Sequence, residues 1–165
     1  MNVSFLNSKD SKNSVLKKQI LNLCINEGDY SLADLSKELN TSIPTITKLV
    51  GELIDDGFLK EVGKLDTNGG RRPSIYGLNP SAGYFVGIDI RVRYISIAVT
   101  DFKGTVIDFH EKLDFSVQNS EQSFRGLCRF IKDQLQENGI DPSMVLSYGF
   151  NLTGEGLNVL AVGNR

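Results

Sequence analysis

Three segments in the first third of the chain show the apolar spacing of amphipathic helices. The first covers residues 13–27, NSVLKKQILNLCINE, in which apolar side chains recur about every 3.6 residues. The second follows Ser31, a predicted N-cap with Asp34 three residues later, as in a capping box. The third covers residues 41–56, with Pro44 in its first turn, where a missing N–H costs nothing. The pattern therefore predicts three short helices.

After Gly57 the apolar period changes from that of a helix to that of a strand. FLKEVGKL and SIYGL are short β-prone runs. They are joined by DTNGGRRP, whose Asn-Gly-Gly core supplies the positive φ angles of a hairpin tip. Three helices followed by a hairpin predict a winged helix-turn-helix over residues 1–80, with the 41–56 helix as the recognition helix.

A different order of elements begins near Gly83. YFVGIDI, YISIAVTD and GTVIDFHEKL are three β-prone runs with short joints, which predict an antiparallel meander. EQSFRGLCRFIKDQLQENG then predicts a helix, and MVLSYGFNL an apolar strand buried in the same sheet. The order β-β-β-α-β matches part of a ribonuclease H-like or actin-like α/β lobe over residues 81–165. The predicted fold class of the whole chain is α+β.

Composition limits the classes of function. The chain has 165 residues, of which 40% are hydrophobic and 23% charged, as in a globular protein. No apolar run approaches the ~20 residues that span a bilayer, and the start MNVSFLNSKDSKNS is polar, so we expect a cytoplasmic protein. The net charge of −2 excludes a generally basic coat, so that any DNA binding must come from local clusters. Cys24 and Cys128 lack metal-site spacing and are predicted core thiols.

One stretch resembles a known family. GGRRPSIYGLNPSAGYFVGIDI, residues 69–90, is similar to the junction in ROK-family transcriptional repressors of the N-acetylglucosamine and xylose type, where a winged-helix domain meets an actin-like sugar-sensing domain. YGFNLTG, residues 148–154, resembles the family's second glycine-bearing strand end. The resemblance implies that residues 1–80 bind a double-stranded DNA operator and that residues 81–165 are a truncated N-terminal part of the sugar-sensing domain. It also implies a sugar or sugar-phosphate inducer for the full-length form, and a homo-oligomer.

Four residues at the start of the 41–56 helix are candidate DNA contacts. Its apolar positions form one stripe, which leaves a polar set on the other side, namely Ser42, Thr45, Thr47 and Lys48. Small hydroxyl groups reach base edges or phosphates, and a lysine suits phosphate or guanine. Thr45 and Lys48, one turn apart, are favoured over Thr47. A solvated helix face is the alternative interpretation.

Arg71 and Arg72 are the second candidate DNA contact. They follow the Gly69–Gly70 hinge in the predicted wing, where guanidinium groups can lie along a minor groove whose narrow A·T tracts concentrate negative potential. A solvated pair in a linker is the alternative. The position directly after a helix-turn-helix favours minor-groove contact.

The residues do not predict an enzyme. Asp89 ends a strand where sugar kinases of the actin-like fold place a metal-linked aspartate, but Ile90, Arg91, Val92 and Arg93 follow it instead of the glycines that admit a phosphate. His110 is the single histidine, and it has no partner set for a triad or a metal site. We therefore predict no catalytic residues, no metal and no cofactor.

Two other functions stay open. The first is a sugar kinase of the same superfamily, although such kinases keep the glycines that are absent after Asp89. The second is a winged-helix module that binds proteins, which is favoured by the balance of ten basic and ten acidic residues within residues 1–80. Specific binding to a palindromic DNA fragment would separate a repressor from both.

Overall fold

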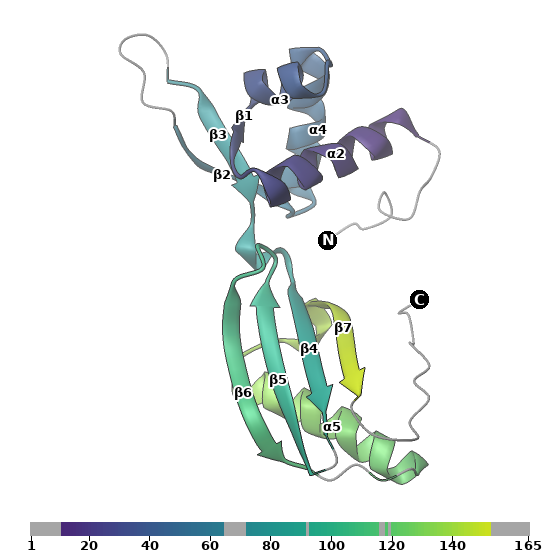
Figure 1. Cartoon of the computed structure of the whole chain (residues 1–165). Helices are drawn as coiled ribbons and strands as arrows, with labels where there is room; N and C mark the ends of the chain where they lie inside the picture. Colours follow the sequence, from purple (N-terminus) through teal and green to yellow (C-terminus); the bar gives the residue numbers. More distant parts are fainter. Residues whose placement is uncertain (1–10, 65–71, 92, 116–117, 119, 153–165) are drawn as a thin grey trace. The chain divides into compact units, whose positions relative to one another are not determined.

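The computed structural model describes residues 11–64, 72–91, 93–115, 118 and 120–152 (Figure 1). The chain divides into two compact units, with the boundary between Ala82 and Gly83. Each unit is described by itself. Among the described residues, no helix has the length and apolar character needed to cross a membrane.

Three helices form the first part of unit 1, as the apolar pattern predicts. They are α2 (Lys12–Asn26), α3 (Leu32–Glu38) and α4 (Ile43–Asp55). The predicted capping box at α3 is present, because the Ser31 hydroxyl accepts from the backbone N–H of Asp34 and the Asp34 carboxylate accepts from that of Ser31. The turn between α3 and α4 contains Asn40 at a φ of 45°, a left-handed conformation that asparagine tolerates.

A three-stranded antiparallel sheet completes unit 1. Its strands are β1 (Tyr30–Ser31), β2 (Leu59–Lys64) and β3 (Ser74–Leu78), in the order β1-β3-β2. The hairpin of β2 and β3 is the predicted wing, and residues 65–71 at its tip lie outside the described residues. Asn79 fixes the exit from β3, because its side-chain amide donates to the Gly57 carbonyl at 2.9 Å and its N–H donates to that of Phe58. The Leu-Asn-Pro exit is thus tied to the end of α4.

The core of unit 1 forms where one face of each helix meets the base of the wing. α4 contributes a stripe of four buried apolar residues to it, Ile46, Leu49, Val50 and Leu53. Buried side chains from the other elements complete the core, among them Ile20, Leu35, Phe58 and Leu59. Because these side chains are removed from water, they fix the rotation of α4 about its own axis.

Unit 2 is a four-stranded sheet with one helix on one face. β4 (Tyr84–Ile90), β5 (Tyr94–Asp101) and β6 (Val106–Asp114) form the predicted antiparallel meander, and β7 (Val145–Leu152) pairs in parallel with β4. The order is β6-β5-β4-β7. α5 (Glu121–Glu137) makes the crossover that a parallel pair requires. The short 3₁₀ turns Pro80–Ala82 and Pro142–Met144 precede β4 and β7.

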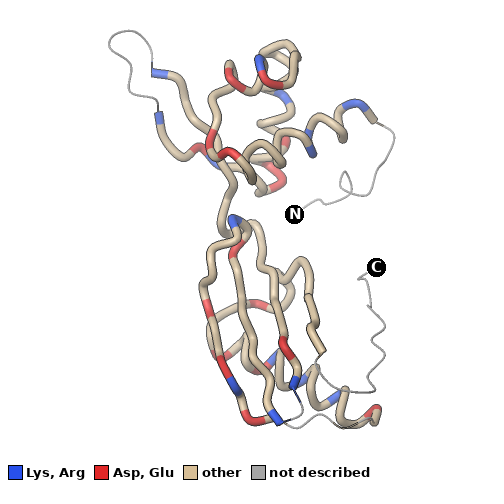
Figure 2. Tube along the Cα trace, in the orientation of Figure 1, with Lys and Arg blue, Asp and Glu red and all other residues tan. Residues whose placement is uncertain are grey.

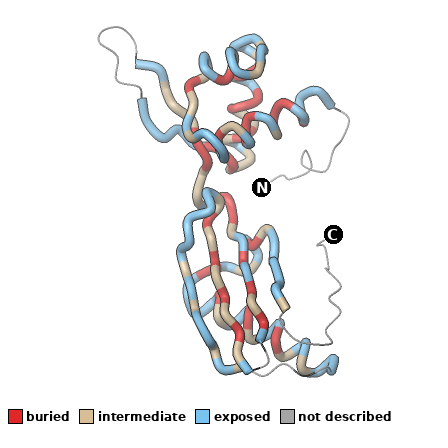
Figure 3. Tube along the Cα trace, viewed as in Figure 1, coloured by how far each residue is buried: buried red, intermediate tan, exposed pale blue. Residues whose placement is uncertain are grey.

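The strands of unit 2 bury one face and leave the other open. Buried and less buried residues alternate along β5 (Figure 3). The buried residues pack against Leu127, Ile131 and Leu135 of α5, and they come from the two central strands: Val86, Ile88, Ile90, Ile95, Ile97 and Val99. The described part of the chain places no helix on the opposite face (Figure 1).

Two predictions of burial are wrong, one for the 144–152 strand and one for Cys128. The 144–152 strand is not buried within the sheet: β7 pairs only with β4 among the described strands, and Tyr148 and Phe150 are exposed. Cys24 is buried as predicted, but Cys128 is exposed on α5. In both cases the apolar pattern indicates that a residue favours burial. Burial also needs a neighbouring element to pack against, and the local pattern does not show whether the fold supplies one.

Candidate nucleic-acid interface

The polar side of α4 faces away from the core of unit 1. With the apolar stripe turned inward, Ser42, Thr47 and Lys48 are exposed and Thr45 is half-buried. The structure therefore brings the four predicted residues together along the first two turns of α4. Thr47 is more exposed than Thr45, although the sequence favours Thr45 as a DNA contact.

Hydrogen bonds orient the hydroxyl groups of this face. Ser42 stands at the N-cap position of α4, but its hydroxyl makes no capping bond and instead lies 2.9 Å from that of Thr45. The Thr47 hydroxyl donates to the Ile43 carbonyl at 2.8 Å, so its oxygen is left as an acceptor. A ligand that approaches the start of α4 thus meets hydroxyl groups in defined positions.

A chain of charges runs from α2 to Lys48. The Lys17 ammonium of α2 lies 2.8 Å from Glu52 Oε2 and 3.6 Å from Asp56 Oδ2, and its side chain is only 11% exposed. Lys48 Nζ lies 3.9 Å from the other oxygen of Glu52, and its side chain is 69% exposed. Glu52 is thus held mainly by Lys17, which leaves the Lys48 ammonium open to an anion.

Basic residues stand at both described ends of the wing. Lys64 ends β2 and Arg72 precedes β3, next to the undescribed tip (Figure 2). Arg72 is exposed, while Arg71 lies outside the described residues. The wing base and the starts of α3 and α4 enclose a hollow of about 380 Å³, lined by Ser31, Leu32, Ala33, Ile43, Lys64, Arg72, Pro73, Ser74 and Tyr76. The wing base and the first residue of α4 therefore line one hollow.

Two residues that line this hollow were not predicted from the sequence. Ile43, the first residue of α4, is 51% exposed. Lys64 lines the same hollow from the wing. A helical projection of α4 places Ile43 in line with the apolar stripe, three residues before Ile46, so the periodicity predicts burial and gives no signal of its exposure. The position of Lys64 depends on the register of the hairpin, which local pattern alone does not fix.

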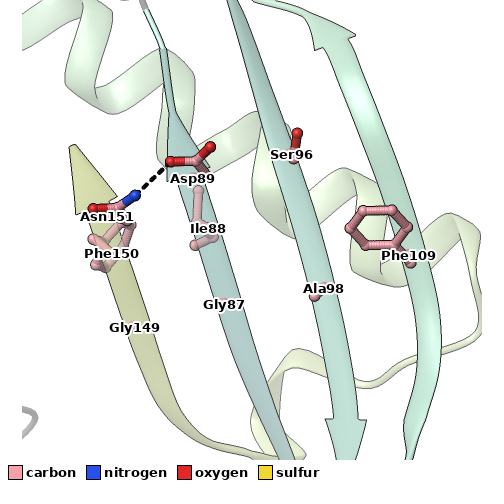
Figure 4. Close-up of a pocket in the computed structure, with 9 residues that line it drawn as sticks. All are labelled: Gly87, Ile88, Asp89, Ser96, Ala98, Phe109, Gly149, Phe150 and Asn151. Carbon is pink, nitrogen blue, oxygen red and sulfur yellow. Dashed lines mark hydrogen bonds between the residues drawn. The ribbon is translucent and has the colours of Figure 1, made fainter. Parts of the chain in front are cut away.

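Unit 2 carries a second hollow, of about 430 Å³, on the open face of its sheet (Figure 4). Gly87, Ala98 and Gly149 form its floor, Phe109 stands at one side, and the polar residues Asp89, Ser96 and Asn151 lie toward the ends of their strands. The small residues leave backbone accessible, because adding a Cβ at Gly87 or Gly149 would bring it near only a neighbouring carbonyl at 4.0 Å.

The Asp89 carboxylate is already engaged within the chain. Asn151 Nδ2 donates to one oxygen at 2.7 Å (Figure 4). Arg91 Nε donates to the other oxygen at 2.9 Å. The hydrogen bond that Arg91 donates to Asp89, and then the negative charge of Asp89, raise the pKa of the Arg91 guanidinium. Among the described residues, no three His, Cys, Asp or Glu side chains gather where they could hold a metal ion. This strand end is therefore neutralised by a cation of the chain itself.

Comparison with known proteins adds to this geometry. A winged helix-turn-helix DNA-binding family matches residues 14–60, which include most of α2 and all of α3 and α4. The xylose repressor of Caldicellulosiruptor bescii is 30% identical over 148 residues, which cover 86% of this chain and 37% of that repressor. The xylose repressor of Bacillus spizizenii is 36% identical over 101 residues, 61% of this chain and 26% of the relative. The chain thus spans well under half the length of both repressors.

A solved structure shares the fold. A ROK-family transcriptional regulator, described as a homologue of the Escherichia coli MLC protein, superposes with a TM-score of 0.64 at 24% identity, over 88% of this chain and 37% of that one. This likeness concerns the fold. With the winged-helix match it confirms the predicted fold class, a winged helix-turn-helix followed by a partial actin-like lobe.

The two ion pairs of Glu52 should differ in strength. We expect the Lys17→Ala, Glu52→Ala double-mutant cycle to give a coupling of about 1 kcal/mol or more in the free energy of unfolding, because Lys17 is nearly buried. The Lys48→Ala, Glu52→Ala cycle should give less than about 0.5 kcal/mol, because Lys48 is exposed. Urea unfolding followed by circular dichroism measures both, and equal couplings would contradict the assignment.

Proposed function

We propose that this chain, which is homologous to the N-terminal part of ROK-family transcriptional repressors of the xylose type, is a sequence-specific DNA-binding repressor of sugar-metabolism genes. The observation that carries the proposal is the shared hollow in unit 1. There, the start of α4 and the basic base of the wing face the same space. The match of residues 14–60 to a DNA-binding family supports the same function.

The two sides of the hollow suit the two grooves of DNA. A recognition helix enters the major groove with its N-terminal residues at the base edges, while a wing reaches the adjacent minor groove. One sugar–phosphate strand separates the grooves and would pass through the hollow. In this arrangement Ser42, Thr45, Thr47 and Lys48 contact the major groove, and Arg71 and Arg72 the minor groove. The proposal places the chain in the cytoplasm, where operator DNA lies.

Local charge is sufficient for this role despite the net charge of −2. Lys64 and Arg72 bring two positive charges to the hollow, and Lys48 adds an exposed positive charge on α4. Lys17 of α2 pairs with Glu52 of α4 and so offsets its negative charge. The balance of basic and acidic residues in residues 1–80 is therefore compatible with DNA binding, and it removes the main support for a protein-interaction module.

For unit 2 we propose the start of a sugar-sensing domain. The relatives are named as xylose repressors, so xylose or a related sugar is the proposed effector of the full-length form. The chain covers 37% of the first relative, and we assign residues 81–165 to the N-terminal part of its second domain. The boundary proposed from the sequence, between residues 80 and 81, lies close to the division at Ala82 and Gly83.

A sugar kinase is the second candidate, since the actin-like fold serves both functions. The residues after Asp89 argue against it. A phosphate loop needs glycines that let backbone N–H groups approach the phosphate, whereas Arg91 and Arg93 occupy this position. Arg91 also takes one oxygen of the Asp89 carboxylate.

The first test concerns the wing arginines. A duplex enriched from a randomised DNA pool by the 165-residue chain should bind at least ten times more tightly than a scrambled duplex in fluorescence anisotropy at stated salt. The double change Arg71→Ala and Arg72→Ala should weaken this binding. It should also lower the salt slope by up to about 0.9 for each phosphate that the variant no longer neutralises.

A matched variant controls for the loss of charge. Arg125→Ala with Arg129→Ala removes the same two charges from exposed positions of α5 in unit 2 and should leave both affinity and slope unchanged. If both double variants changed affinity and salt slope equally, the wing arginines would act only through the net charge of the chain and not through a direct DNA contact.

A second test separates a repressor from a kinase. No ATP-dependent phosphorylation of glucose, N-acetylglucosamine or xylose should be detectable with this chain in a coupled assay, because Asp89 is engaged and the phosphate loop is replaced. A turnover signal that disappears in Asp89→Asn would favour the kinase instead. The asparagine is nearly isosteric and so preserves the shape of the site.

A third test concerns assembly. We propose that the chain is a homo-oligomer through the open sheet face of unit 2, where Phe109 is 58% exposed. Light scattering should then give at least a dimer, and Phe109→Asp should shift it toward the monomer. Phe124→Asp is the matched control, because Phe124 is similarly exposed but lies on α5. A monomer in the unchanged protein would refute this mode of assembly.

A further inference from the structure

Ile43 is an exposed apolar residue at the start of the helix that is proposed to bind DNA. It is the first residue of α4, and half of its side chain is open to solvent. Single exposed apolar residues are common on protein surfaces, so exposure alone carries no weight. The surroundings of Ile43 are informative, because Pro44, Thr47 and Lys48 on the same part of the helix are also exposed.

The hollow in unit 1 shows which way this part of α4 faces. Ile43 lines the hollow together with Lys64 and Arg72 of the wing. A duplex that contacts both the start of α4 and the base of the wing must therefore come within reach of Ile43. This step rests on the proposed function, since it takes α4 as the helix that enters the major groove.

The chemistry of the side chain limits what it can contact there. Isoleucine offers no hydrogen-bond donor or acceptor, and the apolar group that base edges present in the major groove is the C5 methyl of thymine. Its neighbour Thr47, one turn later, has its hydroxyl proton bound to the Ile43 carbonyl, which fixes the local geometry. We propose that Ile43 is a specificity-determining residue that contacts a thymine methyl group in each operator half-site.

The competing contact is the deoxyribose of the strand that crosses the hollow. A sugar contact would stabilise every duplex alike and would carry no sequence information. The two possibilities differ in one atom group, because deoxyuridine lacks the thymine methyl but keeps the sugar, the phosphate and all hydrogen-bonding groups of the base edge. Replacement of thymine by deoxyuridine therefore tests the proposal without changing the protein.

The experiment uses the full 165-residue chain and the duplex enriched from a random pool. Each thymine is replaced in turn by deoxyuridine, and affinity is measured by fluorescence anisotropy. We expect affinity to fall about four-fold at one position in each half-site, the effect of leaving one methyl group unburied. In Ile43→Ser this effect should vanish, and in Ile43→Val it should largely persist. Ile25→Ser, which changes a similarly exposed isoleucine on α2, should keep the full effect.

Each outcome decides the proposal. If no thymine position responds in the unchanged protein, or if the response persists in Ile43→Ser, the thymine contact is refuted while the proposed repressor function stands. If the chain enriches no duplex at all, both the function and the contact fall. Thermal unfolding of Ile43→Ser serves as the folding control, because a half-exposed first residue of a helix contributes little to the core.

Discussion

The burial of one apolar stripe on α4 determines the surface of unit 1. Successive helix residues are turned by about 100°. Once Ile46, Leu49, Val50 and Leu53 face the core, the direction of every other side chain on that helix follows. The residues proposed to touch DNA are thus oriented by residues that cannot touch it. Lys17 adds an electrostatic link from α2 to Glu52 near the opposite end of α4, so that the helix is held along its length.

The same logic of alternate faces shapes unit 2. In β4 the residues Val86, Ile88 and Ile90 point toward α5, which leaves Gly87 and Asp89 on the open face. The parallel pairing with β7 brings Gly149 beside Gly87 and Asn151 beside Asp89. The Asp89 carboxylate at the end of β4 therefore accepts hydrogen bonds from the Asn151 amide of β7 and from the guanidinium of Arg91, which follows β4.

Much of the fold could be predicted because its signals are local. The Ser31 capping box, the stripe on α4 and the change of period after Gly57 each lie within a few residues. The features that could not be predicted depend on distant partners. Asn151 meets Asp89 across 62 residues, and the edge position of β7 follows from the strand order. At the candidate site the polar residues of α4 could be predicted from periodicity. The exposure of Ile43 beside the wing could not, because it depends on how the hairpin packs against the start of α4.

Ser31 belongs to two elements at once. Its backbone pairs with Ile75 of β3, and its side chain caps α3. Neither element can therefore open without disturbing the other: fraying of the first turn of α3 releases the short strand that holds the edge of the wing base, and opening of that strand frees the cap. The wing base and the helix-turn-helix should accordingly exchange their amide hydrogens as one cooperative unit, so that the surface proposed to bind DNA is either formed as a whole or absent.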